Sequence, residues 1–312
     1  MKIGDVKLKN NLFLAPLHGL TINAFRLLCK DFGAGLVFAP IMNENALLNN
    51  PDKVIDVIDE ERPVAGQLIG KDSLKLSKAA KIIEPRFDII DLNLGCPRPK
   101  EVKCGIGAVI LQKPEKVKKL VSTIVKSVSK PVTVKIRLGY NEINVLEIAK
   151  VIEQAGASAI TVHARTARQD YSTPADWSWI KLVKEHVTIP VIGNGDLFTP
   201  VDVKRMLDST NCDAVMIARG ANGNPFIFRE SLYYLKNGVL PRMPTKDERV
   251  KAFLKFMEYY DKYVKNPSVH ELRTHAFWFM KGVPKSKKFR ASLLRSRTRE
   301  GLLSLLKEQH RE

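Results

Sequence analysis

The sequence has little cysteine: only four of its 312 residues, and no two of them form a CxxC pair. This scarcity argues against a disulfide framework and against a zinc site built on paired cysteines, so we expect no bound metal. No stretch approaches the roughly 18–20 consecutive apolar residues that a membrane-spanning helix needs. The first residues, MKIGD, do not form the apolar core of a signal peptide. We therefore expect a cytoplasmic protein without a membrane partner.

Acidic residues are also scarce, and 33 Asp and Glu face 51 Lys and Arg, which gives a formal net charge of +18. More than half of this excess lies in residues 238–312, which contain 18 basic and 8 acidic residues. Residues 281–299 include eight Lys or Arg and no acid. Such a run can be a solvated helix face, but with the overall charge it favours a surface that binds phosphate groups of a polyanion.

The first 237 residues alternate short apolar runs with amphipathic stretches. The runs predict strands at 12–16, 36–40, 64–69, 88–93, 132–137, 159–164, 190–194 and 213–219. Helical periodicity between them predicts helices at 21–32, 73–83, 114–127, 144–154, 177–184 and 199–209. Eight such units predict an α/β fold, a (β/α)8 TIM barrel over 1–237, followed by a small all-α C-terminal domain over 238–312. A doubly wound dinucleotide-binding sheet is the weaker alternative, because no GxGxxG follows the first strand.

Polar residues occur where the predicted strands end, which is where barrel enzymes build their active sites. The loop after the fourth strand is enlarged and contains Cys96, while Lys135 and His163 lie on the next two strands. The glycine-rich turns 193–196 and 218–221 suit a phosphate, because barrels often bind one at their seventh and eighth strands. Each of these residues alone can be structural, but their convergence at one end of a barrel favours a site.

A phosphate site without a dinucleotide fingerprint suits flavin mononucleotide (FMN). A buried lysine such as Lys135 can place positive charge near the N1–C2=O edge of a flavin. A thiol such as Cys96, with an ordinary pKa of about 8.5, is mostly protonated at pH 7 and can act as a general acid. A hydride from the flavin and a proton from the thiol together describe the reduction of an activated C=C bond.

The motifs, in their order along the chain, resemble those of the tRNA-dihydrouridine synthases. Residues 91–97 (DLNLGCP) are similar to the family's most diagnostic segment, D-x-N-x-G-C-P. Residues 14–21 (LAPLHGLT) look like its opening LAPMAGVT, although Leu17 and His18 depart from it. The segments 134–139 (VKIRLG), 163–166 (HART), 193–196 (GNGD) and 216–221 (MIARGA) follow in the family's order.

The resemblance implies an FMN-dependent oxidoreductase that reduces the C5=C6 bond of a specific uridine in tRNA, with NADPH or NADH as the electron donor. It implies hydride transfer from the flavin to C6, a proton from Cys96 to C5, and a uridine flipped out of the tRNA stack. The implied cofactor-binding residues are Pro16, Leu17, His18, Gln67, Asn93, Lys135, His163, Asn194, Gly195, Asp196, Ala218 and Arg219. The expected tRNA-binding residues are Arg137, Arg165, Lys285, Lys287, Lys288, Arg290, Arg295 and Arg297.

Two other functions remain open at this stage. A flavin barrel could reduce a free pyrimidine, although the basic C-terminal region speaks against it. The protein could also be a tRNA-binding or tRNA-folding chaperone with vestigial flavin chemistry. The intact Cys96 and Lys135 argue against this function. We expect the protein to be a monomer.

Overall fold

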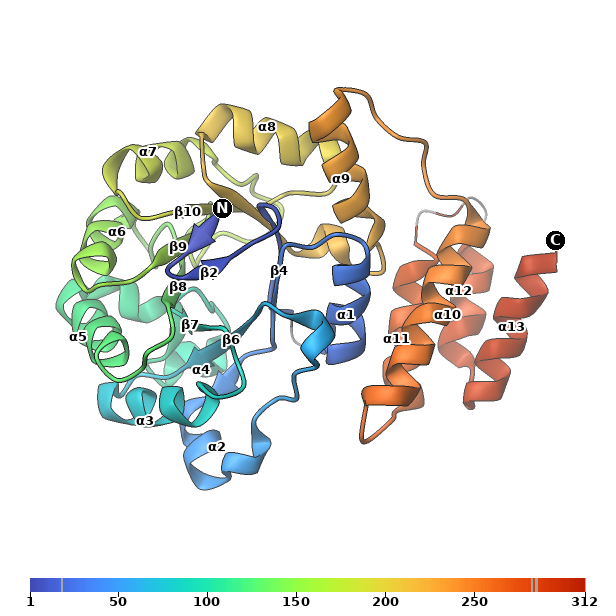
Figure 1. The fold of residues 1–312 in the computed structure, drawn as a ribbon, viewed down its shortest axis with the longest axis horizontal. Helices are drawn as coiled ribbons and strands as arrows, with labels where there is room; N and C mark the ends of the chain where they lie inside the picture. The colour runs from blue at the N-terminus through green and yellow to red at the C-terminus, as the bar shows by residue number, and fades with distance from the viewer. Residues whose placement is uncertain (18, 282, 284–285, 312) are drawn as a thin grey trace.

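The computed structural model describes residues 1–17, 19–281, 283 and 286–311, and its fold is shown in Figure 1. Within this part of the chain, eight parallel strands form a closed barrel. Their order around it is β4-β3-β11-β10-β9-β8-β7-β6, and pairing of β4 with β6 closes the ring. The strands are β3 (Leu12–Leu14), β4 (Leu36–Phe38), β6 (Val64–Ile69), β7 (Ile89–Asn93), β8 (Val132–Arg137), β9 (Ala159–His163), β10 (Val191–Asn194) and β11 (Ala214–Ile217).

Helices cover the outside of the barrel, as the alternating pattern predicts. They are α1 (Asn23–Asp31), α3 (Ser73–Ile83), α5 (Pro114–Val125), α6 (Val145–Gln154), α7 (Ser178–His186), α8 (Pro200–Thr210) and α9 (Phe226–Asn237). The predicted barrel fold is confirmed, and each predicted strand and helix ends within two residues of its observed bounds. Sequence periodicity missed the short β5 (Met42–Asn43), α2 (Glu44–Asn49) and α4 (Pro99–Lys103), because so few residues show no period.

An N-terminal hairpin closes one end of the barrel. Strands β1 (Lys2–Ile3) and β2 (Val6–Lys7) pair antiparallel, with Gly4 in the turn at a φ of 56°. The apolar side chains of Ile3 and Leu8 pack with Phe13 and Phe38 in the barrel interior. The hairpin therefore covers the N-terminal end of the barrel with apolar side chains.

The barrel interior changes from apolar to polar along the strands. Alternate residues of a strand point to the same side, so on β7 Ile89, Asp91 and Asn93 follow one another up the interior. Ile89 belongs to the apolar cluster around Phe13 near the hairpin, whereas Asp91 and Asn93 are buried polar residues nearer the open end. The fold thus places a polar layer between its apolar core and the mouth of the barrel.

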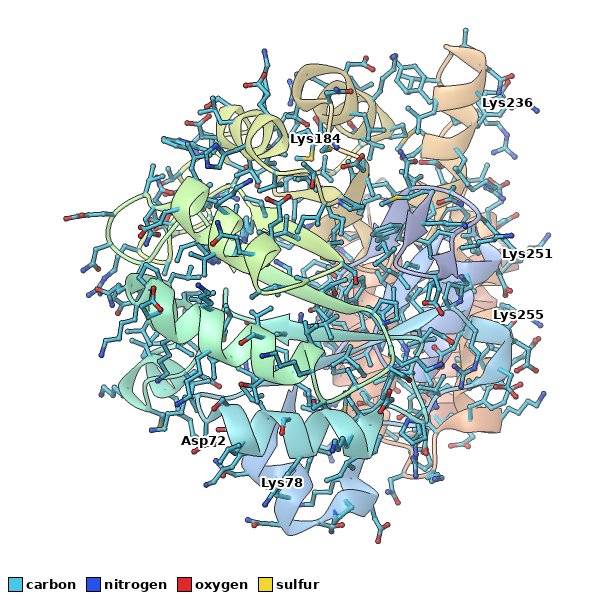
Figure 2. All side chains as sticks on the ribbon, turned by 60° about the vertical axis from the view of Figure 1, so that its left-hand side comes forward. Asp72, Lys78, Lys184, Lys236, Lys251 and Lys255 are labelled. Carbon is cyan, nitrogen blue, oxygen red and sulfur yellow. The ribbon has the colours of Figure 1, made fainter. Side chains whose placement is uncertain are left out.

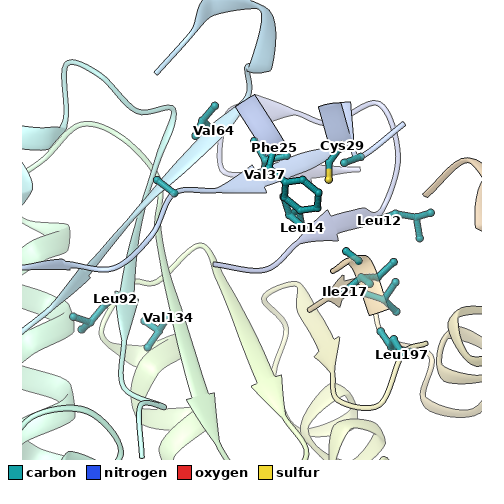
Figure 3. Close-up of a cluster of buried hydrophobic side chains, with 14 of the residues drawn as sticks. Leu12, Leu14, Phe25, Cys29, Val37, Val64, Leu92, Val134, Leu197 and Ile217 are labelled. Atoms are coloured by element: carbon teal, nitrogen blue, oxygen red, sulfur yellow. The ribbon is translucent and has the colours of Figure 1, made fainter. Parts of the chain in front are cut away.

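A second, larger core separates the strands from the helices. Figure 3 shows part of it, where Phe25 and Cys29 of α1 lie near Leu14 and Val37 of β3 and β4. All four side chains are at most 1% exposed. At about 25 cal/mol per Å2 of buried apolar surface, this layer is a main source of the stability that holds the strand ends in place.

In the described part of the chain, four helices follow the barrel; the first of them packs against α1, and the others pack on one another beside it (Figure 1). They are α10 (Lys246–Tyr263), α11 (Val269–Phe279), α12 (Lys287–Arg295) and α13 (Arg299–Arg311). Phe25 of α1 makes edge-on contacts with Phe256 and Phe279, at ring-centroid distances of 6.5 and 6.3 Å. Helix α9 ends at Asn237, and Gly238 follows it in the left-handed conformation. The predicted boundary between residues 237 and 238 therefore coincides with a helix end, and the division into two domains stays a prediction.

Lysine side chains lie on outer helices of both parts of the chain. In Figure 2, Lys78, Lys184, Lys236, Lys251 and Lys255 extend from helices of both the barrel and the C-terminal part. Part of the net charge of +18 is therefore spread over the outer helices of the barrel. In the described part of the chain, no helix is both long and apolar enough to cross a membrane.

Candidate active site

A cavity of about 220 Å3, partly open to solvent, lies at the carboxyl ends of the barrel strands. The predicted residues that line it are Pro16, Leu17, Asn93, Cys96, Lys135, Arg137, His163, Asn194, Gly195, Asp196, Ala218 and Arg219. The structure thus brings together most of the side chains that the sequence analysis singled out.

Cys96 lies just after β7 and is held there by its own loop. Its backbone N–H donates to the side-chain oxygen of Asn93 at 2.9 Å, and its carbonyl accepts from the N–H of Ala108 at 2.9 Å. Gly107 has a φ of 75°, and a Cβ there would lie 2.5 Å from the Cys96 carbonyl oxygen, so only glycine allows this close approach. The loop therefore folds back onto Cys96 and leaves it 8% exposed.

The thiol of Cys96 is protonated at neutral pH. Burial raises its pKa above the usual value, although the backbone N–H of Arg98 lowers it in part. A nucleophilic cysteine needs the opposite, a pKa lowered toward neutrality. The site therefore suits a thiol that donates a proton.

Lys135 of β8 and Asn194 of β10 line the cavity on either side of β9. The Nζ of Lys135 lies 3.2 Å from the side-chain oxygen of Asn194, whose amide nitrogen donates to the carbonyl of Met216 at 2.6 Å. Burial and the nearby charge of Arg137 lower the pKa of Lys135 to about 8. Lys135 therefore remains mostly cationic at pH 7 and supplies a positive charge inside the cavity.

His163 is held neutral by its surroundings. Burial, followed by the charges of Lys135, Arg137 and Arg165, lowers its pKa far below the usual value. Its Nε2 lies 3.3 Å from a guanidinium nitrogen of Arg165. Because a guanidinium only donates, Nε2 must accept, and the single ring proton is on Nδ1. His163 can therefore act as a hydrogen-bond donor, but not as an acid at neutral pH.

Asp196 is the centre of an ion-pair cluster at the rim. Its carboxylate accepts from Arg165 at 2.5 Å and from Arg219 at 2.8 Å. Burial alone would raise its pKa, but the hydrogen bonds from Arg165 and Ala175 and both arginine charges lower the pKa below its usual value. Asp196 also has a φ of 54°, a left-handed conformation that this cluster stabilises. The cluster fixes the turn that connects β10 to α8.

Two exposed aromatic residues at the rim were missed by the sequence analysis. Tyr171 is 59% exposed and Phe198 is 46% exposed, and both line the cavity. The guanidinium of Arg219 lies between them, 3.9 Å from the Tyr171 ring centroid and 5.1 Å from that of Phe198. Both residues are in loops without periodicity, so only their position after a predicted strand could have indicated them.

Several predicted site residues lie elsewhere. Gln67 is fully buried below the cavity and does not line it, and Arg165 is 1% exposed, with its guanidinium bonded to Thr173, His163 and Asp196. Direct contacts of these two with cofactor or tRNA stay predictions that the geometry does not favour. His18 and Lys285 lie outside the described residues.

The predicted basic surface is largely exposed to solvent. Arg290 is half-buried, with its guanidinium 5.0 Å from the ring centroid of Phe277. The exposed members are Lys287, Lys288, Arg295 and Arg297. No described group of three or more His, Cys, Asp or Glu residues could hold a metal ion. Whether the basic side chains contact tRNA stays a prediction.

Solved structures share the barrel fold. An old yellow enzyme homologue from Zymomonas mobilis has a TM-score of 0.53 at 13% identity, with 78% of this chain and 93% of that chain covered. Histamine dehydrogenase from Rhizobium sp. 4-9 has a TM-score of 0.55 at 16% identity, and 83% of this chain spans only 50% of that longer chain. At these identities the likeness concerns the fold alone.

Sequence relatives define the family. Residues 13–311 match the profile described as dihydrouridine synthase (Dus). The chain is 37% identical to tRNA-dihydrouridine synthase B of Pasteurella multocida, over 93% of this chain and 90% of the relative. It is 36% identical to the protein of the same name in Escherichia coli K12, over 93% of this chain and 92% of the relative. The resemblance seen in the motifs is confirmed: this chain belongs to the dihydrouridine synthase family.

Proposed function

We propose that this protein is an FMN-dependent tRNA-dihydrouridine synthase that reduces the C5=C6 bond of a uridine in tRNA, using NADPH or NADH. Family membership and the name of the curated relatives support the reaction class. The observation that carries the proposal is the protonated thiol of Cys96 in the same cavity as the cation Lys135. A proton donor and a fixed positive charge are what the reduction of a uracil ring by a flavin requires.

The cavity has features that fit both ends of an FMN molecule. Near β11, Arg219 supplies a cation, and η4 (Arg219–Ala221) begins at the cavity. The first N–H groups of a helix have no acceptor within it, so those of Arg219 and Gly220 suit phosphate oxygens. Lys135, which also lines the cavity, would lie against the ring system and stabilise its negatively charged reduced form.

The chemistry divides between the cofactor and the protein. When bound, FMN supplies the hydride that the C6 atom of uracil receives. The thiol of Cys96 gives its proton to C5, and the resulting thiolate recovers a proton from water, so two hydrogen atoms in total are added to the base. Because the pKa of Cys96 is raised, the thiol is in the proton-bearing form before each turnover.

The remaining polar residues orient the reactants. His163, with its proton on Nδ1, can donate a hydrogen bond, and Arg137 holds the loop by donating to the carbonyls of Gly95 and Thr166 at 3.0 and 2.8 Å. The target uridine must leave the tRNA stack to enter a cavity of this depth, which costs a few kcal/mol. The exposed rings of Tyr171 and Phe198 at the rim suit stacking on such an exposed base.

We propose that residues 1–237 form the catalytic domain and residues 238–312 the tRNA-binding domain. The exposed basic residues of α12, Lys287, Lys288 and Arg295, and the adjacent Arg297 support this division. Phosphate contacts position a nucleic acid without reading its sequence. The C-terminal helices would therefore supply affinity, and the cavity would supply the chemistry.

The direct test is to incubate the purified protein with FMN, NADPH and unmodified tRNA and to digest the tRNA for nucleoside mass spectrometry. We expect a uridine that gains two hydrogen atoms, and no turnover of free uracil. Turnover of free uracil or orotate at a comparable rate would instead support a free-pyrimidine reductase. Tight tRNA binding without any electron transfer from the reduced protein would support a chaperone.

A further inference from the structure

A continuous chain of hydrogen bonds runs below the cavity from β8 to Cys96. Thr133 donates to one carboxylate oxygen of Asp91 at 2.6 Å, and the amide of Gln67 donates to the other oxygen at 2.6 Å. The amide of Asn93 donates to the Gln67 oxygen at 2.8 Å. The side-chain oxygen of Asn93 then accepts the backbone N–H groups of Gly95 and Cys96 at 3.1 and 2.9 Å.

The direction of each bond in this chain follows from Asp91. An ionised carboxylate has acceptors only, so Gln67 must turn its NH2 toward Asp91 and its oxygen toward Asn93. Asn93 must then turn its own NH2 toward Gln67, which leaves its oxygen facing the loop. If either amide were reversed, a donor would face a donor or an acceptor would face an acceptor, and a buried polar group would lose its partner.

The residues that start the chain do not touch the cavity. Asp91 and Gln67 are 0% exposed, Thr133 is 1% exposed, and none of the three lines the cavity, whereas Asn93 and Cys96 both do. The hydrogen bonds connect Asp91 to the cavity through Gln67, Asn93 and the backbone of Cys96, whereas its charge also acts on Lys135. Strand register explains the arrangement, because Gln67 pairs with Asp91 and Asp91 pairs with Thr133 across β6, β7 and β8.

We propose that Asp91 is a positioning residue that fixes the orientation of Gln67 and Asn93 and thereby holds Cys96 at the place from which it protonates the substrate. The positioning of Cys96 stands on the hydrogen bonds alone, and its consequence for the reaction rests on the proposed function. A carboxylate with only a packing role would have no defined relation to the Cys96 loop.

The test exchanges donor and acceptor in the hydrogen bond between Gln67 and Asp91. Gln67→Glu places a second carboxylate against Asp91. Combining it with Asp91→Asn lets the new amide at position 91 donate to the carboxylate at position 67, which keeps Asn93 in its present orientation. The readout is the rate at which iodoacetamide alkylates Cys96 in the FMN-loaded protein, followed by peptide mass spectrometry. The exposed Cys104 in the same loop provides an internal reference.

We expect Q67E to raise the labelling rate of Cys96 about fivefold, since one lost hydrogen bond corresponds to about 1 kcal/mol. The double variant should return to within about twofold of the natural protein. Labelling of Cys104 should not change in either. A double variant that labels as fast as Q67E, or a Q67E protein that labels like the natural one, would overturn the proposal.

A second pair of variants guards against misfolding. Thr133→Val removes one donor to Asp91, whereas Thr161→Val removes a buried hydroxyl that has no hydrogen-bond partner among the described residues. Both threonines are buried on barrel strands, Thr133 on β8 and Thr161 on β9, so the two changes are matched in size and in burial. T133V should raise Cys96 labelling and T161V should not; equal rates in the two would contradict the proposal.

The half-reactions separate this inference from the proposed function. T133V should slow oxidation of the reduced protein by tRNA, whereas T161V should leave that rate within about twofold of the natural one. If the natural protein itself is never oxidised by tRNA, the proposed function fails. The labelling rates would still decide whether Asp91 positions Cys96, because they need neither NADPH nor tRNA.

Discussion

The side-chain oxygen of Asn93 accepts the backbone N–H of Cys96 at 2.9 Å, so the last residue of β7 fixes the first turn of the loop that carries the thiol. A strand end is among the most rigid places in a barrel, and a site supported in this way keeps its geometry between turnovers. The spacing N-x-x-C in the sequence is therefore a structural requirement, because the oxygen of Asn93 reaches only the N–H groups two and three residues ahead.

Replacing Cys96 by Ala should abolish dihydrouridine formation while FMN stays bound. Reduction by NADPH should remain within about twofold, and oxidation by tRNA should fall by about 100-fold or more, the usual size of a lost general acid. Stopped-flow absorbance of the flavin measures both steps. The matched control is Cys104→Ala in the exposed part of the same loop, which should react like the natural protein; full activity of C96A would refute the role of the thiol.

Replacing Asp91 by Asn should change stability in a pH-dependent way. Burial raises the pKa of Asp91 to about 6, although Gln67 and Thr133 oppose the shift. A raised carboxyl pKa favours folding below the unfolded pKa of about 3.9, and this contribution is lost as the pH rises through about 6. The stability of D91N relative to the natural protein should therefore increase by about 2 kcal/mol between pH 4 and pH 7.

Urea titrations at several pH values measure this difference. A constant difference across the range would show that Asp91 is not the buried, ionised group that the structure indicates. If D91N is more stable than the natural protein at pH 7 but its Cys96 is alkylated faster, Asp91 serves function at a cost in stability.

The affinity for FMN should fall above pH 8. Lys135 has its pKa lowered to about 8 by burial and by Arg137, so its charge disappears at a lower pH than that of an ordinary lysine. If FMN binds the charged form, its dissociation constant should rise by up to about tenfold per pH unit above 8. Fluorescence titration of FMN measures the dissociation constant. Lys135→Arg should move the loss of FMN affinity to higher pH because arginine keeps its charge.

Neutralising the exposed basic residues of α12 should weaken tRNA binding. Changing Lys287, Lys288 and Arg295 to Gln should reduce the slope of log affinity against log salt by up to about 0.7–0.9 per lost phosphate contact. Filter binding at several salt concentrations provides the slope. A matched triple change at Lys78, Lys81 and Lys118, on the barrel helices α3 and α5, should have little effect. Equal effects of the two triple variants would show that tRNA affinity depends on the net charge of the protein and not on a contact surface at α12.

The sequence indicated the barrel well because its signals are local. Near-continuous apolar strands and the amphipathic helices between them repeat often enough to specify the fold, and the ends of Val132–Arg137 and Ser73–Ile83 were predicted to the residue. Cys96, Lys135 and His163 were found because polar residues at the ends of such strands have few structural reasons to be there. Those positions follow from the periodicity of single elements.

Depth inside the barrel was not predictable in this way. Gln67 is a predicted cofactor contact, and its pairing with Asp91 on the next strand places its side chain below the cavity. Arg165 is a predicted tRNA contact, and Asp196, 31 residues further along the chain, holds its guanidinium inside. Long polar side chains follow whichever partner the register brings near, and that register depends on all eight strands together.

The central claim is tested most directly by mapping dihydrouridine in the tRNA of cells that carry or lack this gene. Mass spectrometry should find at least one tRNA position that is dihydrouridine with the natural gene and uridine without it. Expression of the natural protein should restore the modification, and C96A at the same level should not. An unchanged tRNA in the deletion strain, together with no product from the purified protein, would contradict the account.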